Sequence, residues 1–143
     1  MLDSLNKYTE SGHFFFEPSQ RLQDVCNAPT DKSGVYIIYE LRKGKVDLIY
    51  VGCSGRLKAD GKMFVRKAGG LKDRIVNGHQ FGKTPRRLAW PIQMTTANID
   101  ALDIYWYVTH CDSYQDCPRR VERELLQKYF DTYARLPKWN KAL

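Results

Sequence analysis

Residues 34–53, GVYIIYELRKGKVDLIYVGC, contain two apolar runs joined by a basic segment with a central glycine. Val, Ile and Tyr dominate both runs, a composition typical of β-strands. We therefore expect strands at about 34–41 and 46–53, joined as a hairpin. A hairpin with aromatic faces is common scaffold, so its importance depends on what the rest of the chain supplies.

The register of this hairpin decides where its tyrosines point. A three-residue loop at 43–45 would place Tyr36 opposite Gly52 and put Tyr36 and Tyr50 on one face of the sheet. A four-residue loop would put the two phenols on opposite faces, because side chains alternate along a strand. With the first register, Gly52 would leave an open patch beside Tyr36 that a phosphate could approach.

The remaining chain predicts an α/β (α+β) fold with a small central three-stranded antiparallel sheet flanked by helices. We expect residues 1–32 to be an N-terminal extension packing on a single domain at 33–143. Its His13–Phe16 cluster favours core packing over stacking on bases. Further expected elements are helices at about 19–26, 71–76 and 118–134, a helix after Thr84 interrupted or restarted at Pro91, a strand at 102–109, and a long loop or small hairpin around Asp60-Gly61.

Length and composition suit one soluble domain, because a chain of 143 residues buries a sizeable core without metal or disulfide. No stretch resembles a transmembrane span or a signal peptide, so we expect a cytoplasmic protein that does not insert in membranes. The four cysteines then favour free thiols. His110, Cys111 and Cys117 supply only part of a zinc site.

The net charge of +7 is concentrated in one block. Residues 56–87 hold ten Lys or Arg against two Asp, a net +8, whereas the rest of the chain has a net charge of −1. Such a block is typical of a protein that binds a phosphate backbone, and a solvated basic loop is the alternative. The candidate DNA-binding residues are Gly52, Arg56, Lys58, Lys62, Arg66, Lys67, Lys72, Lys83, Arg86 and Arg87.

The predicted last helix carries a carboxylate in an unusual place. At 100° per residue, Glu122 falls near the middle of an apolar face formed by Val121, Leu125, Leu126, Tyr129, Phe130 and Tyr133. Glu124 falls on the polar side. A carboxylate among apolar side chains must be paired, protonated or bound to a metal, and a salt bridge to an arginine is the structural alternative.

Five features, in this order along the chain, resemble the GIY-YIG endonuclease superfamily. They are Gly34-Val35-Tyr36, Tyr50-Val51-Gly52, Arg74 in a helix, Glu122 in the pattern ERELLQKY, and Asn140 in PKWN. The resemblance covers roughly residues 33–140. Each motif alone is weak, but the five together, on the expected elements, are fairly specific.

The departures from the family pattern are also informative. Arg74 lies farther from Gly52 than in many members, so the basic segment between them resembles an insertion. His79 stands one residue beyond the place of the histidine that many members carry, and a surface histidine is the alternative interpretation. Glu124 stays open as an alternative ligand, because a few members show a similar Glu-Arg-Glu.

The resemblance implies a divalent-metal-dependent DNA endonuclease that hydrolyses phosphodiester bonds. Glu122 would be the sole protein ligand of Mg²⁺ or Mn²⁺, which keeps waters and phosphate oxygens as its other ligands. Tyr36 would be the general base, with Tyr50 positioning the water or sharing that role, and Arg74 would offset phosphate charge. Asn140 would hold the site together.

DNA is the expected partner of such an enzyme. Because no separate DNA-binding domain is visible, a homodimer or larger complex is possible. The alternative to an endonuclease is a catalytically inactive nucleic-acid-binding module of the same fold.

Overall fold

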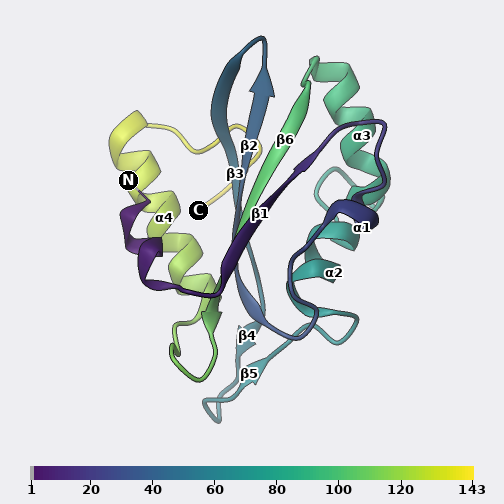
Figure 1. Cartoon of the computed structure of the whole chain (residues 1–143). Coiled ribbons are helices and arrows are strands. Elements are labelled where there is room, and N and C mark those ends of the chain that lie inside the picture. Colours follow the sequence, from purple (N-terminus) through teal and green to yellow (C-terminus); the bar gives the residue numbers. More distant parts are fainter. Residues whose placement is uncertain (1) are drawn as a thin grey trace.

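A computed structural model describes residues 2–143 and has a four-stranded antiparallel sheet at its centre (Figure 1). Its order is β1 (Ser11–Phe16), β6 (Ala101–His110), β2 (Ser33–Arg42) and β3 (Lys45–Ser54). The expected mixed fold with an antiparallel sheet is confirmed, but the count of three strands is wrong. The N-terminal segment adds β1, because Phe14 and Phe16 alternate into the core while Phe15 stays exposed.

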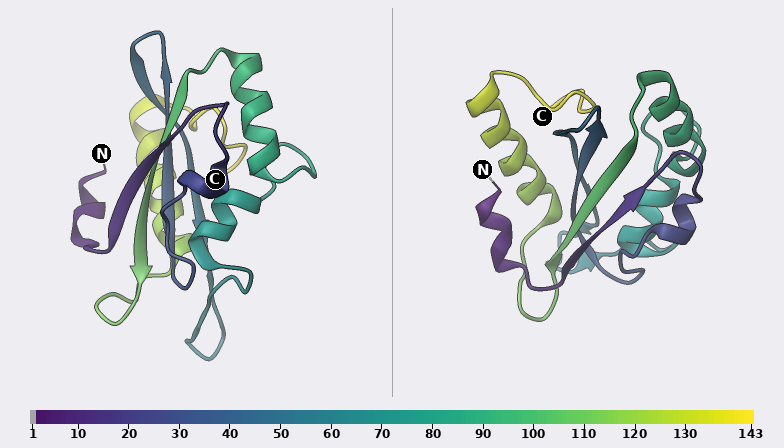
Figure 2. Two further views of the ribbon diagram at one scale, coloured as in Figure 1. Left: turned by 45° about the vertical axis from the view of Figure 1, so that its right-hand side comes forward. Right: turned by 45° about the horizontal axis from the view of Figure 1, so that its top comes forward.

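Helices cover both faces of this sheet, as the two views of Figure 2 show. On one face lie α1 (Leu22–Val25), α2 (Gly70–Asn77) and α3 (Arg86–Ala97), and on the other lie α4 (Pro118–Tyr133) and the 3₁₀-helix η1 (Asp3–Lys7). Strand β2 is central and faces both layers. Tyr36 and Ile38 pack toward α2 and α3, whereas Val35 and Ile37 pack toward α4.

The β2–β3 hairpin has a two-residue turn, Lys43-Gly44, and the expected three-residue loop is wrong. Both turn residues have positive φ, 52° and 75°, as a turn matched to the twist of the strands requires. A β-bulge at Ile49 then adds one residue to β3, so that the register shifts before Tyr50. The shorter turn alone would pair Tyr36 with Val51. The extra residue of the bulge moves the pairing by one position, so the expected pairing of Tyr36 with Gly52 is confirmed.

The helices follow the apolar spacing with two exceptions. In α3 the chain continues as a helix through Pro91, so the expected interruption there is wrong. In α4, Val121, Leu125 and two further apolar residues are buried, but Phe130 and Tyr133 are 46% and 50% exposed. These two residues lie in the last turn of α4, outside the buried cluster that its earlier turns form with the sheet.

A second, two-stranded sheet follows β3. It pairs β4 (Arg56–Leu57) with β5 (Met63–Phe64), which confirms the small hairpin expected around Asp60-Gly61. Figure 1 shows this hairpin projecting beyond the end of the central sheet. Among the described residues, no helix has the length and apolar character needed to cross a membrane.

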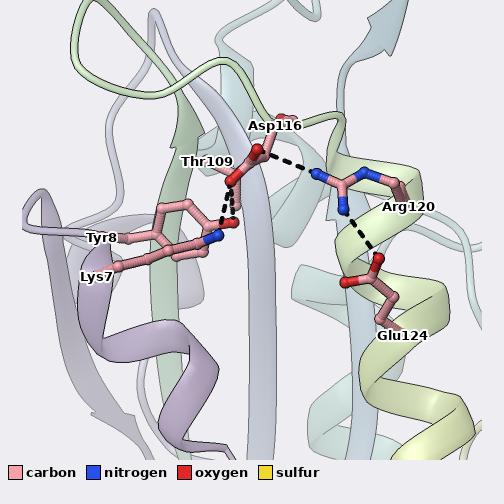
Figure 3. A network of polar contacts seen from close by, with 6 residues as sticks. All are labelled: Lys7, Tyr8, Thr109, Asp116, Arg120 and Glu124. Atoms are coloured by element: carbon pink, nitrogen blue, oxygen red, sulfur yellow. Dashed lines mark hydrogen bonds and ion pairs between the residues drawn. The ribbon is translucent and has the colours of Figure 1, made fainter.

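The start of α4 is tied to the N-terminal segment by a polar network (Figure 3). The Tyr8 hydroxyl donates to Asp116 Oδ2 at 2.6 Å, and Lys7 Nζ lies 3.2 Å from the same oxygen. Arg120 Nη2 donates to Asp116 Oδ1 at 3.0 Å, and Thr109 Oγ1 donates to the Asp116 carbonyl at 3.1 Å. The network thereby fixes the first turns of α4 against η1 and the end of β6.

Candidate active site

A cleft of about 610 Å³ lies beside β3, the strand at one edge of the central sheet. Because β3 is an edge strand, residues from both helical layers can reach around it. The cleft is lined by β3 itself, the β4–β5 hairpin, α2 with the loop after it, the first turns of α4, and residues 139–143. Segments far apart in the sequence therefore meet at this edge.

The two phenols lie together beneath the cleft, with ring centroids 6.0 Å apart. Tyr50 lines the cleft, whereas Tyr36 is 0% exposed and its hydroxyl has no hydrogen-bond partner. Burial raises the pKa of Tyr50, and the nearby Tyr36 raises it further. The expectation that Gly52 leaves an open patch is wrong, because the two rings fill that space: a Cβ on Gly52 would lie 2.5 Å from Tyr36 Cζ.

Arg74 approaches the phenols from α2. Leu71 and Ile75, on the buried side of α2, hold this helix against the sheet. The Arg74 side chain lines the cleft, and its pKa is raised chiefly by the neighbouring Tyr36 phenol. Its Nε is buried without a hydrogen-bond partner, so the guanidinium keeps a free donor beside the tyrosines.

Glu122 reaches the cleft from α4, on the opposite side of β3 from Arg74. Burial raises the pKa of Glu122, and nearby cationic groups, Arg74 among them, oppose the rise. Burial, and after it the nearby Glu122, raise the pKa of the Cys53 thiol to about 12. Glu124, in contrast, is 57% exposed and pairs with Arg120 at 2.9 Å. Of the two glutamates that the sequence left open, only Glu122 lines the cleft.

Asn140 closes the edge of β3. Its Oδ1 accepts the Val51 backbone N–H at 3.0 Å, and its Nδ2 donates to the Val51 carbonyl at 2.9 Å. The Trp139 N–H donates to the Ile49 carbonyl at 2.9 Å, so the tail continues the hydrogen bonding of the sheet. Both polar atoms of the Asn140 side chain are thereby engaged by the protein.

The charge of the cleft is strongly positive. Glu122 is the single acidic side chain among its described lining residues, which include five arginines: Arg56, Arg66, Arg74, Arg119 and Arg123. The sequence did not single out Arg119 and Arg123, although Arg119 stands three residues before Glu122 and four before Arg123, spacings that make helix residues neighbours. Such a surface suits a polyanionic substrate, which can neutralise several guanidinium groups at once.

The nine basic residues predicted to bind DNA divide into three groups, and Gly52, the tenth predicted residue, does not line the cleft. Arg56 and Arg66 line the cleft, and Arg66 also pairs with Asp73 at 2.5 Å. Outside the cleft, and at least partly exposed, are Lys58, Lys62, Lys67, Lys72, Lys83 and Arg87. The prediction that Arg86 contacts DNA is wrong, because Arg86 is 0% exposed and stacks against Tyr36, Tyr50 and Trp90.

The loop after α2 supplies two further lining residues. His79 is exposed at the cleft and pairs with Pro85 as an isolated bridge, so it keeps the surface position that one interpretation of the sequence gave it. Gln80 was not singled out by the sequence. Its Oε1 accepts from Arg86 Nε and Trp90 Nε1, both at 3.1 Å, while its Nε2 is buried without a partner.

The side chains of the cleft fit a metal ion only if water and substrate oxygens supply most of its ligands. No group of three or more His, Cys, Asp or Glu side chains that could hold a metal occurs in residues 2–143. Glu122 alone offers a carboxylate there. Mg²⁺ commonly binds through one or two carboxylates together with waters and substrate phosphates, so this site suits an ion that arrives with a phosphate group.

Comparison of the chain with protein-family models, curated proteins and solved structures finds no match. The residues of the cleft are therefore the basis on which a function can be inferred. Four of the five catalytic residues expected from the sequence, Tyr50, Arg74, Glu122 and Asn140, line the cleft, and the fifth, Tyr36, lies directly behind Tyr50.

Proposed function

We propose that this protein is a divalent-metal-dependent DNA endonuclease of the GIY-YIG type, which hydrolyses phosphodiester bonds. The observation that carries the proposal is the composition of the cleft. Two neighbouring phenols, a single partly buried carboxylate and five arginines converge on one edge strand. Cationic side chains suit the phosphate backbone, the carboxylate suits Mg²⁺ or Mn²⁺, and a phenol can exchange a proton with water.

Hydrolysis needs three things that these residues can supply. Arg74, with the α4 arginines, would offset the charge that develops on the phosphoryl oxygens. One of the two tyrosines would accept the proton of the attacking water. Glu122 would hold the metal ion, which when bound would reduce the negative charge of the phosphate and favour deprotonation of water.

The electrostatics of the cleft support these roles. Burial raises the pKa of Glu122 because it disfavours the charged carboxylate, and a cation bound beside that carboxylate would favour the charged form. Arg74 Nε and the Tyr36 hydroxyl are both buried, and the Tyr36 phenol raises the pKa of Arg74 and so keeps its guanidinium charged. Because the Arg74 side chain lines the cleft, this charge can act on a phosphate group bound there.

Cleavage of supercoiled plasmid tests the proposal. We expect nicking with Mg²⁺ or Mn²⁺, none with EDTA, and none for Glu122→Gln. Glu124→Gln is the matched control, because it removes a carboxylate two residues away on the same helix that pairs only with Arg120 at the surface. Activity in Glu122→Gln equal to that of the native protein would contradict the metal assignment.

A second outcome identifies the alternative function. DNA binding without any metal-dependent cleavage would indicate a catalytically inactive nucleic-acid-binding module. Absence of salt-dependent DNA affinity would exclude both functions, since the phosphate contacts of a basic surface weaken as salt rises.

A further inference from the structure

Arg86 is a buried cation without an acidic partner. It is the first residue of α3 and is fully buried, with its guanidinium carbon 5.3 Å from the centroid of the Tyr36 ring and 5.5 Å from those of Tyr50 and Trp90. Within residues 2–143, no carboxylate forms an ion pair with it. Burial of an unpaired charge is costly, so this position calls for a physical reason.

The side-chain hydrogen bonds of Arg86 give that reason, because all of them go to residues that line the cleft. Nε donates to Gln80 Oε1 at 3.1 Å, and Nη1 donates to the Arg74 carbonyl at 2.8 Å. Nη2 makes a longer contact, 3.4 Å, with the Tyr50 hydroxyl oxygen. Arg86 therefore connects three elements of the cleft wall from behind, without entering the cleft itself.

The amide of Gln80 is oriented by this arrangement. Its Oε1 accepts from both Arg86 and Trp90, which fixes oxygen and nitrogen in their places. Its Nε2 is then a buried donor with no partner, on a side chain that lines the cleft. An unpaired buried donor is unfavourable, and a small movement of the Gln80 side chain toward the cleft would let Nε2 donate to an oxygen of a bound phosphate.

The same arrangement distinguishes the two phenols. Tyr50 lines the cleft and has Arg86 Nη2 beside its hydroxyl, whereas Tyr36 is enclosed behind it. We propose that Arg86 is a positioning residue that fixes Tyr50 and Gln80 at the cleft wall, so that Tyr50 rather than Tyr36 receives the proton of the attacking water. This inference rests on the proposed nuclease function.

The proton balance of this step is simple. Tyr50 first releases its own proton to solvent in the cleft, and its oxygen then takes a proton from the attacking water. The water oxygen bonds to phosphorus as the bond from phosphorus to the leaving oxygen breaks, and that oxygen takes a proton from solvent. Burial, Tyr36 from β2 and Glu122 from α4 raise the pKa of Tyr50, so release of its proton depends on Arg86 from α3 and Arg74 from α2, whose charges lower that pKa.

The first arm of the test compares the two phenols. Single-turnover cleavage of supercoiled plasmid is measured with Mg²⁺ for the native protein, Tyr50→Phe and Tyr36→Phe. We expect Tyr50→Phe to lose roughly 10²–10⁴-fold in rate, the contribution of a general base, and Tyr36→Phe to lose less. The reverse order would overturn the assignment of Tyr50.

The second arm asks whether Arg86 acts through Tyr50. Arg86→Lys keeps the charge but not the forked donors, so we expect a lower cleavage rate at saturating DNA with an unchanged Kd for DNA. The loss should appear in full in a Tyr36→Phe background and disappear in a Tyr50→Phe background. Equal losses in both backgrounds would overturn the inference.

Arg135→Lys is the matched control for this arm. Arg135 also stacks on two tyrosines, Tyr129 and Tyr133, and donates to the Tyr129 hydroxyl at 3.1 Å, but it does not line the cleft. We expect no change in rate from it. A loss like that of Arg86→Lys would show that the effect is one of general stability and would overturn the positioning role.

A further variant keeps the proposal testable if Arg86→Lys does not fold. Gln80→Glu keeps an acceptor for Arg86 and Trp90, replaces the unpaired Nε2 donor by an oxygen, and adds a negative charge. We expect a reduced rate at saturating DNA, and an unchanged rate would overturn the role of this donor. Lack of cleavage by the native protein would instead contradict the proposed function, so the two failures are distinguishable.

Discussion

Tyr36 and Tyr50 lie on the same face of the sheet only because β3 carries one unpaired residue, Ile49, in its ladder with β2. A two-residue turn without a bulge would pair Tyr36 with Val51 and turn Tyr50 toward α4. The bulge at Ile49 reverses this for every residue after it. The proximity of the phenols, and with it the proposed chemistry, therefore depends on a backbone irregularity.

Gly52 should tolerate no side chain. In Gly52→Ala the new Cβ would lie 2.5 Å from Tyr36 Cζ and 2.6 Å from Tyr50 Cε2, so at least one ring must move. We expect the free energy of unfolding to fall by about 1–3 kcal/mol, as for other overpacked sites. Urea denaturation measures this change, and plasmid cleavage should slow in the same variant. A variant of native stability and rate would show that the rings have room to move.

Asn140 should stabilise the protein through the backbone of Val51. Asn140→Ala removes two hydrogen bonds and leaves the Val51 N–H and C=O without their partners. We expect a loss of about 1–3 kcal/mol in the free energy of unfolding, because unsatisfied backbone groups are costly. Asn140→Asp should also destabilise, since its carboxylate cannot donate to the carbonyl. Equal stability of all three proteins in urea would contradict this role.

The Asp116 network should make stability depend on pH. The hydrogen bond from Tyr8 and the neighbouring cations hold the pKa of Asp116 below its usual 3.8. Because the folded state has the lower pKa, the stabilisation is fully present above the unfolded pKa and is lost as pH falls through the folded pKa.

Urea denaturation between neutral and acidic pH measures this effect. Asp116→Asn should be less stable than the native protein near neutral pH, and the difference should shrink as the solution is acidified. A difference that stays constant down to strongly acidic pH would show that the charge of Asp116 contributes nothing.

The β4–β5 hairpin should contribute to DNA affinity in a salt-dependent way. Lys58 and Lys62 are exposed on this hairpin, and neither forms an ion pair among the described residues. Replacing both by Ala should reduce the slope of log K against log salt by about 2, since each lost phosphate contact removes roughly 0.9. Fluorescence anisotropy with a DNA duplex provides the measurement.

The control for the hairpin is Lys128→Ala, on the exposed side of α4 and outside the cleft. Its slope should equal that of the native protein. A double variant with the native slope would exclude the hairpin from the DNA-binding surface.

Much of the candidate site could be predicted from the sequence, because local spacing determined it. The apolar side of the last helix separated Glu122 from Glu124, and the spacing in LKDRI placed Leu71 and Ile75 inward. In both cases the helical period alone decides which way a side chain points. The pairing of Tyr36 with Gly52 was also predicted, but with the wrong turn.

The remaining features depend on tertiary contacts that no local pattern reports. Arg86 belongs to a basic run, PRR, and only the packing of α3 on the sheet shows that it is buried whereas Arg87 is exposed. The fourth strand depends on pairing between β1 and β6, which are separated by most of the chain. The bulge at Ile49 is a further example, because no local pattern predicted it. Without it, Tyr36 and Tyr50 would lie on opposite faces of the sheet.

The segment that closes β3 also has a consequence for aggregation. Without the hydrogen bonds from Trp139 and Asn140, the outer edge of β3 at Ile49 and Val51 would lose its cover. An open strand edge readily pairs with other chains. A chain that lacks residues 139 and 140 would consequently combine an incomplete cleft with an open strand edge that is prone to aggregation.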